Sequence, residues 1–242
     1  MAKKLVLAVF FGIYDGHGGS KAAEFVAENL HKNMFQKLEN RLENIAKQDA
    51  IREAYLKTDK EFLKLGVSSG ACCVTALVEG KELFISNVGD CRAVICRGGW
   101  AKALTKDHRA AEVDERTRIE KNGGYVELHR GAWRVHGVLS VSKSIGDAHL
   151  NDWVLAEPDT RILALTPDME YLVLASDGLW EEVGNQEAID IVKWSCLAGK
   201  KPGHKGESET GKVNDDEFGC ISTSPSPRLR KVLLVKHKKR SY

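Results

Sequence analysis

The sequence lacks any apolar run approaching the ~20 residues that a membrane-spanning helix requires. Residues 5–11 follow the basic start Met1-Ala-Lys-Lys and imitate the apolar part of a signal peptide. This segment has no Ala-x-Ala cleavage pattern, however, and it leads into the polar residues Asp15-Gly16-His17. We therefore predict a buried strand at residues 5–14, no signal peptide and no contact with a membrane.

Paired cysteine motifs are also missing. No two of the six cysteines have the C-x-x-C spacing of metal or redox sites. Cys72 and Cys73 are adjacent in a strand-like run, so their side chains should face opposite ways. We predict reduced, mostly buried thiols in an intracellular protein of the cytoplasm or nucleus. The six cysteines are Cys72, Cys73, Cys91, Cys96, Cys196 and Cys220.

Excess charge is nearly absent, since the net charge of the 242 residues is only +2, and this gives no reason to expect a nucleic-acid partner. The charge is unevenly placed, because residues 199–242 contain 11 Lys and Arg against 5 Asp and Glu. Gly, Ser, Lys and Pro dominate that segment up to Pro227. We predict one domain at residues 1–198 and a basic, largely disordered tail at 199–242. Nucleic-acid binding by the tail is a third functional hypothesis, which rests on the tail alone.

The hydrophobic pattern changes period along the chain. Helical spacing extends from a capping Ser20 to Met34 and again from Ile51 to Leu65. Apolar, β-branched runs follow, and because two or three residues separate the first three of them, we predict that these are antiparallel neighbours. We expect the last two runs to pair as well. The runs lie at residues 71–78, 82–88, 91–97, 161–165 and 171–175. With further helices at 111–121 and 186–196, the pattern predicts an α+β fold, with helices packed against antiparallel sheet.

Two Asp-Gly pairs follow apolar strands and are candidates for chemistry. Asp15 and Gly16 can supply a carboxylate and a closely approaching backbone carbonyl, which suit Mg²⁺ or Mn²⁺. His17 beside them could donate a proton to a leaving oxygen. Asp177, at the end of residues 171–175, could join Asp15 at one sheet edge. Each pair is equally consistent with a tight turn.

Three other segments are ambiguous or misleading without further context. Asp107-His108 and residues 142–147 are typical of solvated loops, and Gly89-Asp90 is typical of a turn. Residues 66–70 match the nucleophile-elbow pattern G-x-S-x-G, but a helix precedes them and a strand follows, which is the reverse of the elbow's context. The sequence has no G-x-G-x-x-G dinucleotide fingerprint.

Several segments, taken together, resemble the 2C-type metal-dependent protein serine/threonine phosphatases, and plant members in particular. They occur in the family's order between about residues 9 and 196. The segments are Phe10-Phe11-Gly12-Ile13-Tyr14-Asp15-Gly16-His17-Gly18-Gly19, Asn87-Val88-Gly89-Asp90-Cys91-Arg92-Ala93-Val94, Leu104-Thr105-Lys106-Asp107-His108, residues 135–147, Ala156-Glu157-Pro158-Asp159 and Ala175-Ser176-Asp177-Gly178-Leu179-Trp180.

This resemblance implies two packed antiparallel β-sheets flanked by helices, with two Mg²⁺ or Mn²⁺ ions at one end of the sandwich. It implies that Asp15 bridges both ions, that Gly16 contributes its carbonyl and that Asp177 binds one ion. Asp107 matches a position linked to a third, weaker metal. His17 matches the general acid in the dephosphorylation of phosphoserine and phosphothreonine in proteins, which makes phosphoproteins the expected substrates.

The sequence also departs from the family pattern. Nothing in residues 1–5 resembles the family's phosphate-binding Arg and Met-Glu-Asp segment, and the final Asp-containing strand has no match after Cys196. Lys143 stands where the family commonly has Arg, and we assign it to phosphate binding, although Lys cannot copy the bidentate fork of Arg. Glu181 replaces a common Asp. We therefore expect an incomplete, monomeric phosphatase domain, and the alternative is a catalytically impaired phosphatase-like binding module or truncated product.

Overall fold

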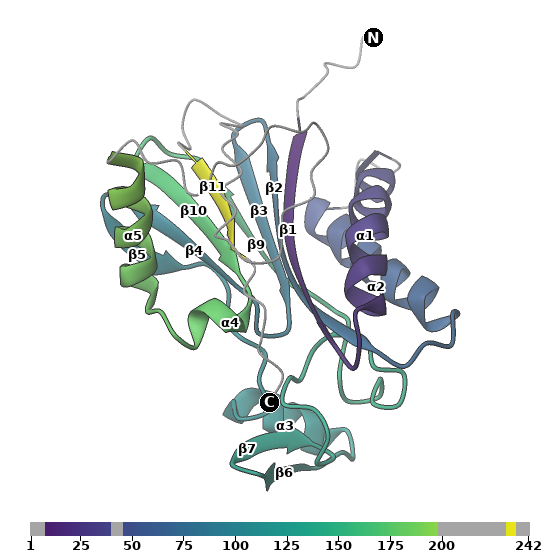
Figure 1. Cartoon of the computed structure of the whole chain (residues 1–242). Coiled ribbons are helices and arrows are strands. Elements are labelled where there is room, and N and C mark those ends of the chain that lie inside the picture. The colour runs from purple at the N-terminus through teal and green to yellow at the C-terminus, as the bar shows by residue number, and fades with distance from the viewer. Residues whose placement is uncertain (1–7, 40–45, 198–230, 236–242) are drawn as a thin grey trace.

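The computed structural model describes residues 8–39 and 46–197, together with the backbone of residues 231–235. Two β-sheets face each other, with helices on the outside of each, as Figure 1 shows. This arrangement confirms the predicted α+β class and the predicted pair of packed sheets. None of the helices in these ranges is both long enough and apolar enough to cross a membrane.

The first sheet has five strands and is antiparallel throughout. Its central path runs β1-β2-β3-β9, and the short strand β8 also pairs with β2. The predicted strand at 82–88 coincides with β3, and the run at 71–78 forms most of β2. The strands are β1 (Ala8–His17), β2 (Gly70–Glu79), β3 (Glu82–Val88), β8 (Ile145–Gly146) and β9 (Asp159–Ala164).

The second sheet has the order β11-β10-β4-β5. Its strands are β4 (Arg92–Arg97), β5 (Trp100–Ala103), β10 (Met169–Ala175) and β11 (Lys231–Val235). β11, yellow in Figure 1, runs parallel to β10, whereas the other pairs are antiparallel. The sequence pattern assigns these five residues to the basic tail and predicts no strand there. The remainder of the predicted tail lies outside the described residues.

Two predicted strand pairings are wrong. β3 and β4 belong to different sheets, because the chain crosses between them at Gly89, whose φ of 89° suits glycine. β9 and β10 also separate, since β9 pairs with β3 and β10 with β4. A short connection can join the two layers of a sandwich as readily as two neighbours of one sheet, so its length did not decide the partner.

Helices α1 (Lys21–Glu39) and α2 (Lys47–Leu63) cover the outer face of the first sheet, and α5 (Asn185–Leu197) lies against the second (Figure 1). The helical spacing correctly predicted the buried faces of α1 and α2, which include Val26, Leu30, Ile51 and Phe62. The prediction that Leu65 belongs to the buried helical face is wrong, because Leu65 lies beyond the end of α2 and is 56% exposed.

The inter-sheet core determines where the candidate site lies. Residues from both sheets fill it, among them Phe11 and Ile13 of β1, Val74 and Ala76 of β2, and Leu172 and Leu174 of β10. A smaller unit of α3 (Val113–Lys121), β6 (Val126–His129) and β7 (Ala132–Val135) lies to one side of the sandwich (Figure 1). Five cysteines fall in the described ranges and are free, as predicted, whereas Cys220 lies outside these ranges.

Candidate functional site

Asp15 and His17 lie within a strand, not in a turn after it. β1 continues through both residues and pairs Asp15 with Cys72 and His17 with Gly70 of β2. The sequence predicted a strand end at Tyr14 because Asp and Gly are depleted in strands, but pairing with β2 overrides this preference. Side chains alternate along a strand, so Asp15 and His17 follow Phe11 and Ile13 on the face toward the second sheet.

Asp177 approaches from the second sheet. It is the first residue of the short helix α4 (Asp177–Trp180), directly after β10, and is 6% exposed. Burial raises the pKa of the Cys91 thiol, and the nearby carboxylates of Asp15, Asp90 and Asp177 raise it further. The strand registers bring the two predicted ligands to the same end of the sandwich. Tyr14, next to Asp15, and Val88 both pair with Cys73, and residues 89–91 lead from Val88 to Arg92, which pairs with Ala175 just before Asp177.

Asp90 is a third carboxylate at this place, and the sequence analysis interpreted it as part of a turn. It is 7% exposed, and burial raises its pKa, as does the charge of Asp177. The Arg109 guanidinium opposes this effect, with Nη2 at 3.4 Å from Asp90 Oδ2. The sequence feature that could have identified Asp90 as a site residue is its position in segment 87–94, which resembles the family. In the structure, Asp90 follows Gly89, where the chain crosses from one sheet to the other.

Two other predicted site residues are held by partners of opposite charge. Arg92 donates to both carboxylate oxygens of Asp107, at 3.0 and 2.7 Å. Lys143 donates to Asp159 at 2.6 Å. The pKa of Asp159 is lowered, first by His108, whose Nε2 lies 3.1 Å from Asp159 Oδ2, and then by the hydrogen bond from Lys143. The roles of Asp107 in metal binding and Lys143 in phosphate binding stay predictions.

The expected solvated loops are buried. His108 is 1% exposed, and residues 142–147 are all buried. In that segment, the Asp147 carboxylate lies 2.6 Å from Nε2 of His17, a contact between residues 130 positions apart. Sequence patterns report neighbours along the chain, so this pairing could not be anticipated from spacing.

The donor set fits a hard divalent cation. Mg²⁺ is commonly held by one or two carboxylates and completes its shell with water and substrate phosphate. Asp15, Asp177 and the Gly16 carbonyl supply oxygen atoms of this kind. The side chains that the structure describes contain no group of three or more His, Cys, Asp or Glu that could hold a metal ion. Bound ions would therefore need water or phosphate as further ligands.

Comparison with known proteins identifies the family. Residues 3–204 match the family model "Protein phosphatase 2C". "Probable protein phosphatase 2C 14" of Arabidopsis thaliana is 56% identical over 227 residues, which cover 94% of this chain and 50% of that protein. "Probable protein phosphatase 2C 30" of the same plant is 53% identical over 196 residues, covering 80% of this chain and 50% of that protein. The chain thus spans about half the length of these curated relatives.

Solved structures share the fold at lower identity. A serine-threonine phosphatase 2C from Toxoplasma gondii aligns with a TM-score of 0.71 and 23% identity, covering 80% of this chain and 75% of that one. A C. elegans sex determining protein aligns with a TM-score of 0.74 and 21% identity, covering 78% and 48%. The matched family model extends over most of the sequence and includes every segment that forms the site. The chain therefore belongs to the protein phosphatase 2C family.

Proposed function

We propose that this chain hydrolyses phosphoserine and phosphothreonine in proteins, with Asp15, Gly16 and Asp177 holding Mg²⁺ or Mn²⁺ and His17 acting as general acid. The observation that carries the proposal is that Asp15 and Asp177 lie at the same end of the two facing sheets. His17 follows Asp15 by two residues on the same strand face, which supports its assignment as the proton donor.

The proposed reaction transfers a phosphoryl group to water. The water oxygen forms a bond to phosphorus, the bond to the serine or threonine oxygen breaks, and His17 gives that oxygen a proton. The products are inorganic phosphate and a free hydroxyl group. When bound, divalent ions make water easier to deprotonate and neutralise charge on the phosphoryl oxygens.

Asp107 and Lys143 have secondary places in this proposal. Asp107 would bind a weaker, third ion only if one of its two carboxylate oxygens gave up its hydrogen bond from Arg92. Lys143 would bind phosphate only if it broke its ion pair with Asp159. The Arg92–Asp107 pair, which occupies a predicted metal ligand, favours the second candidate function, a phosphatase-like module that binds phosphoproteins without turning them over. We also infer an intracellular monomer, in keeping with the free cysteines of the described ranges.

Hydrolysis of p-nitrophenyl phosphate and of a phosphothreonine peptide by the purified chain tests the proposal. We expect turnover with Mn²⁺, and loss of turnover with EDTA or with Asp177→Asn. Asp152→Asn is the matched control, because this carboxylate is exposed and outside the site. Calorimetry should show that Mn²⁺ binding weakens in Asp177→Asn and not in the control.

A folded, monodisperse chain that binds the phosphopeptide without hydrolysing it would support the binding module instead. Robust turnover in EDTA would contradict the assignment of the carboxylates to metal ions.

A further inference from the structure

We propose that Asp147 is a positioning residue, which fixes the His17 imidazole so that Nδ1 is the nitrogen that delivers the proton. This inference rests on the proposed function, in which His17 is the general acid. It extends that function by assigning the reacting nitrogen and by naming the side chain that selects it.

The contacts of the Asp147 carboxylate determine the assignment. Oδ2 of Asp147 lies 2.6 Å from Nε2 of His17, and the Ser144 hydroxyl donates to the same oxygen at 2.5 Å. An ionised carboxylate can only accept hydrogen bonds, so His17 donates from Nε2. When the ring carries both protons, the Nε2 proton is held by Asp147 and the Nδ1 proton is the one given to the leaving oxygen, which leaves a neutral imidazole with its proton on Nε2. The Asp147 side chain is 5% exposed, whereas that of His17 is 28% exposed.

The backbone holds Asp147 in place. Its φ of 49° lies in the left-handed region, and its N–H donates to the Ser69 carbonyl at 3.2 Å. The preceding residues form β8, in which Gly146 pairs with Gly70 of β2, the same residue that pairs with His17 of β1. A carboxylate on such a segment has little freedom to follow a moving imidazole, so it can define the ring's orientation.

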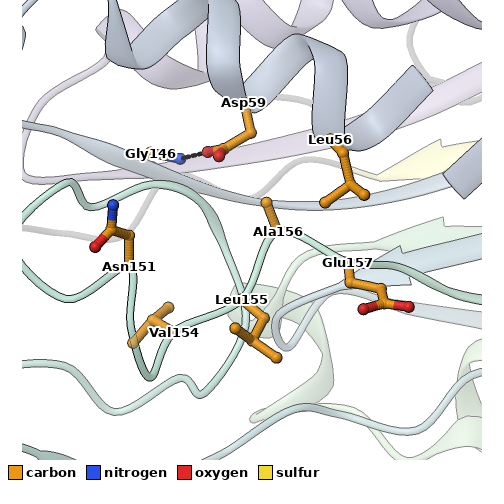
Figure 2. A pocket seen from close by; sticks show the side chains of 8 residues that line it. All are labelled: Leu56, Asp59, Gly146, Asn151, Val154, Leu155, Ala156 and Glu157. Carbon is orange, nitrogen blue, oxygen red and sulfur yellow. Dashed lines mark hydrogen bonds between the residues drawn. The ribbon is translucent and has the colours of Figure 1, made fainter. Parts of the chain in front are cut away.

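Helix α2 provides a second support. Asp59 accepts a hydrogen bond from the Gly146 N–H at 2.8 Å, and Figure 2 shows this bond in the wall of a cavity of about 220 Å³. Burial raises the pKa of Asp59, and the neighbouring charge of Asp147 raises it as well. The residue before Asp147 is therefore tied to α2 on one side and to β2 on the other.

Gly70 completes the arrangement by its lack of a side chain. A Cβ there would lie closer than 3.0 Å to both Asp147 Oδ2 and His17 Nε2. The His17–Asp147 contact thus occupies the space that any other residue at position 70 would fill. This close fit is typical of a fixed pair rather than of two side chains that meet by chance at a surface.

The kinetic test compares two leaving groups. The serine oxygen is a strongly basic leaving group and needs a proton, whereas p-nitrophenolate is weakly basic and leaves without one. We expect Asp147→Ala to lower kcat for a phosphoserine peptide by about 100-fold or more, as loss of general acid catalysis does. The rate with p-nitrophenyl phosphate should fall far less, and Asp147→Asn, which keeps an acceptor oxygen, should restore part of the loss. Asp152→Asn serves as the surface control.

Equal loss with both substrates in folded Asp147→Ala would overturn the proposal, because a merely structural residue would produce that result. No loss with either substrate would also overturn it. Thermal unfolding of each variant shows whether it folds. If Asp147→Ala does not fold, the same comparison of the two substrates is made with Asp147→Asn.

A second readout does not depend on activity. Nitrogen NMR of the His17 ring in alkaline buffer, where the imidazole is neutral, should show the proton on Nε2 in the wild type, a mixture of tautomers in Asp147→Ala, and an intermediate result in Asp147→Asn. A proton on Nδ1 in the wild type would overturn the proposal. If the wild type hydrolyses neither substrate, the proposed function fails, and this measurement alone decides whether Asp147 orients the ring.

Discussion

Gly70→Ala adds a single methyl group at the point where β1, β2 and β8 meet. The backbone of Gly70 is not in the left-handed region, so an alanine can adopt it without strain. The methyl group would lie closer than 3.0 Å to Asp147 Oδ2 and His17 Nε2, and both polar atoms would have to move. The substitution therefore separates the effect of lost space from the effect of changed backbone conformation.

The expected stability change is moderate and the expected activity change is large. Overpacking of a well-packed interior costs about 1–3 kcal/mol. In a chain of this size, about 1 kcal/mol shifts the unfolding midpoint by roughly 2–4 °C. Displacement of His17 from the reacting position should lower kcat for a phosphoserine peptide by about 100-fold, within the range for loss of an acid catalyst.

Calorimetry and steady-state kinetics on the same preparation measure both changes. Gly184→Ala is the matched control, because a Cβ there would meet no atom within 4 Å and its φ is not in the left-handed region. A Gly70→Ala variant with wild-type kcat and an unmoved His17 would refute the argument. A variant that loses activity only through unfolding would show that the site tolerates no movement of the sheet.

Two further predictions concern stability, and a third concerns association. Phe62→Ala should reduce the free energy of unfolding in urea by about 3–5 kcal/mol, because Phe62 is fully buried, and a loss below about 1 kcal/mol would contradict that burial. His108 and Lys143 lower the pKa of Asp159 in the folded state, so Asp159 stabilises the fold above its ordinary pKa and loses this effect as pH falls through the lowered value. The stability difference between wild type and Asp159→Asn, measured by denaturant titration, should therefore be constant near neutral pH and shrink in acid, and a pH-independent difference would contradict the ion pair. Removal of residues 231–242 should expose the edge of β10 and promote association, and a monodisperse truncated chain in light scattering would contradict that.

Local patterns predicted the elements well where one face of an element is buried. The buried faces of α1 and α2 follow from helical spacing, and the bounds of β3 match the predicted run. Strand partners could not be derived in the same way. All but the last residue of β2 are buried, so its polar and apolar side chains do not alternate. The sequence of β2 therefore does not show which of its faces packs on the second sheet or which strands pair with it.

The sequence by itself determined the family and named the candidate site residues Asp15, Gly16, His17 and Asp177, because they lie in short segments that occur in the family's order. Only the tertiary structure decided which side chains meet there. It brought Arg109 to Asp90, paired Asp107 with Arg92, and brought Asp147 to His17. These contacts join positions from 15 to 130 residues apart, so they depend on which strands become neighbours in each sheet, and no local pattern contains that information.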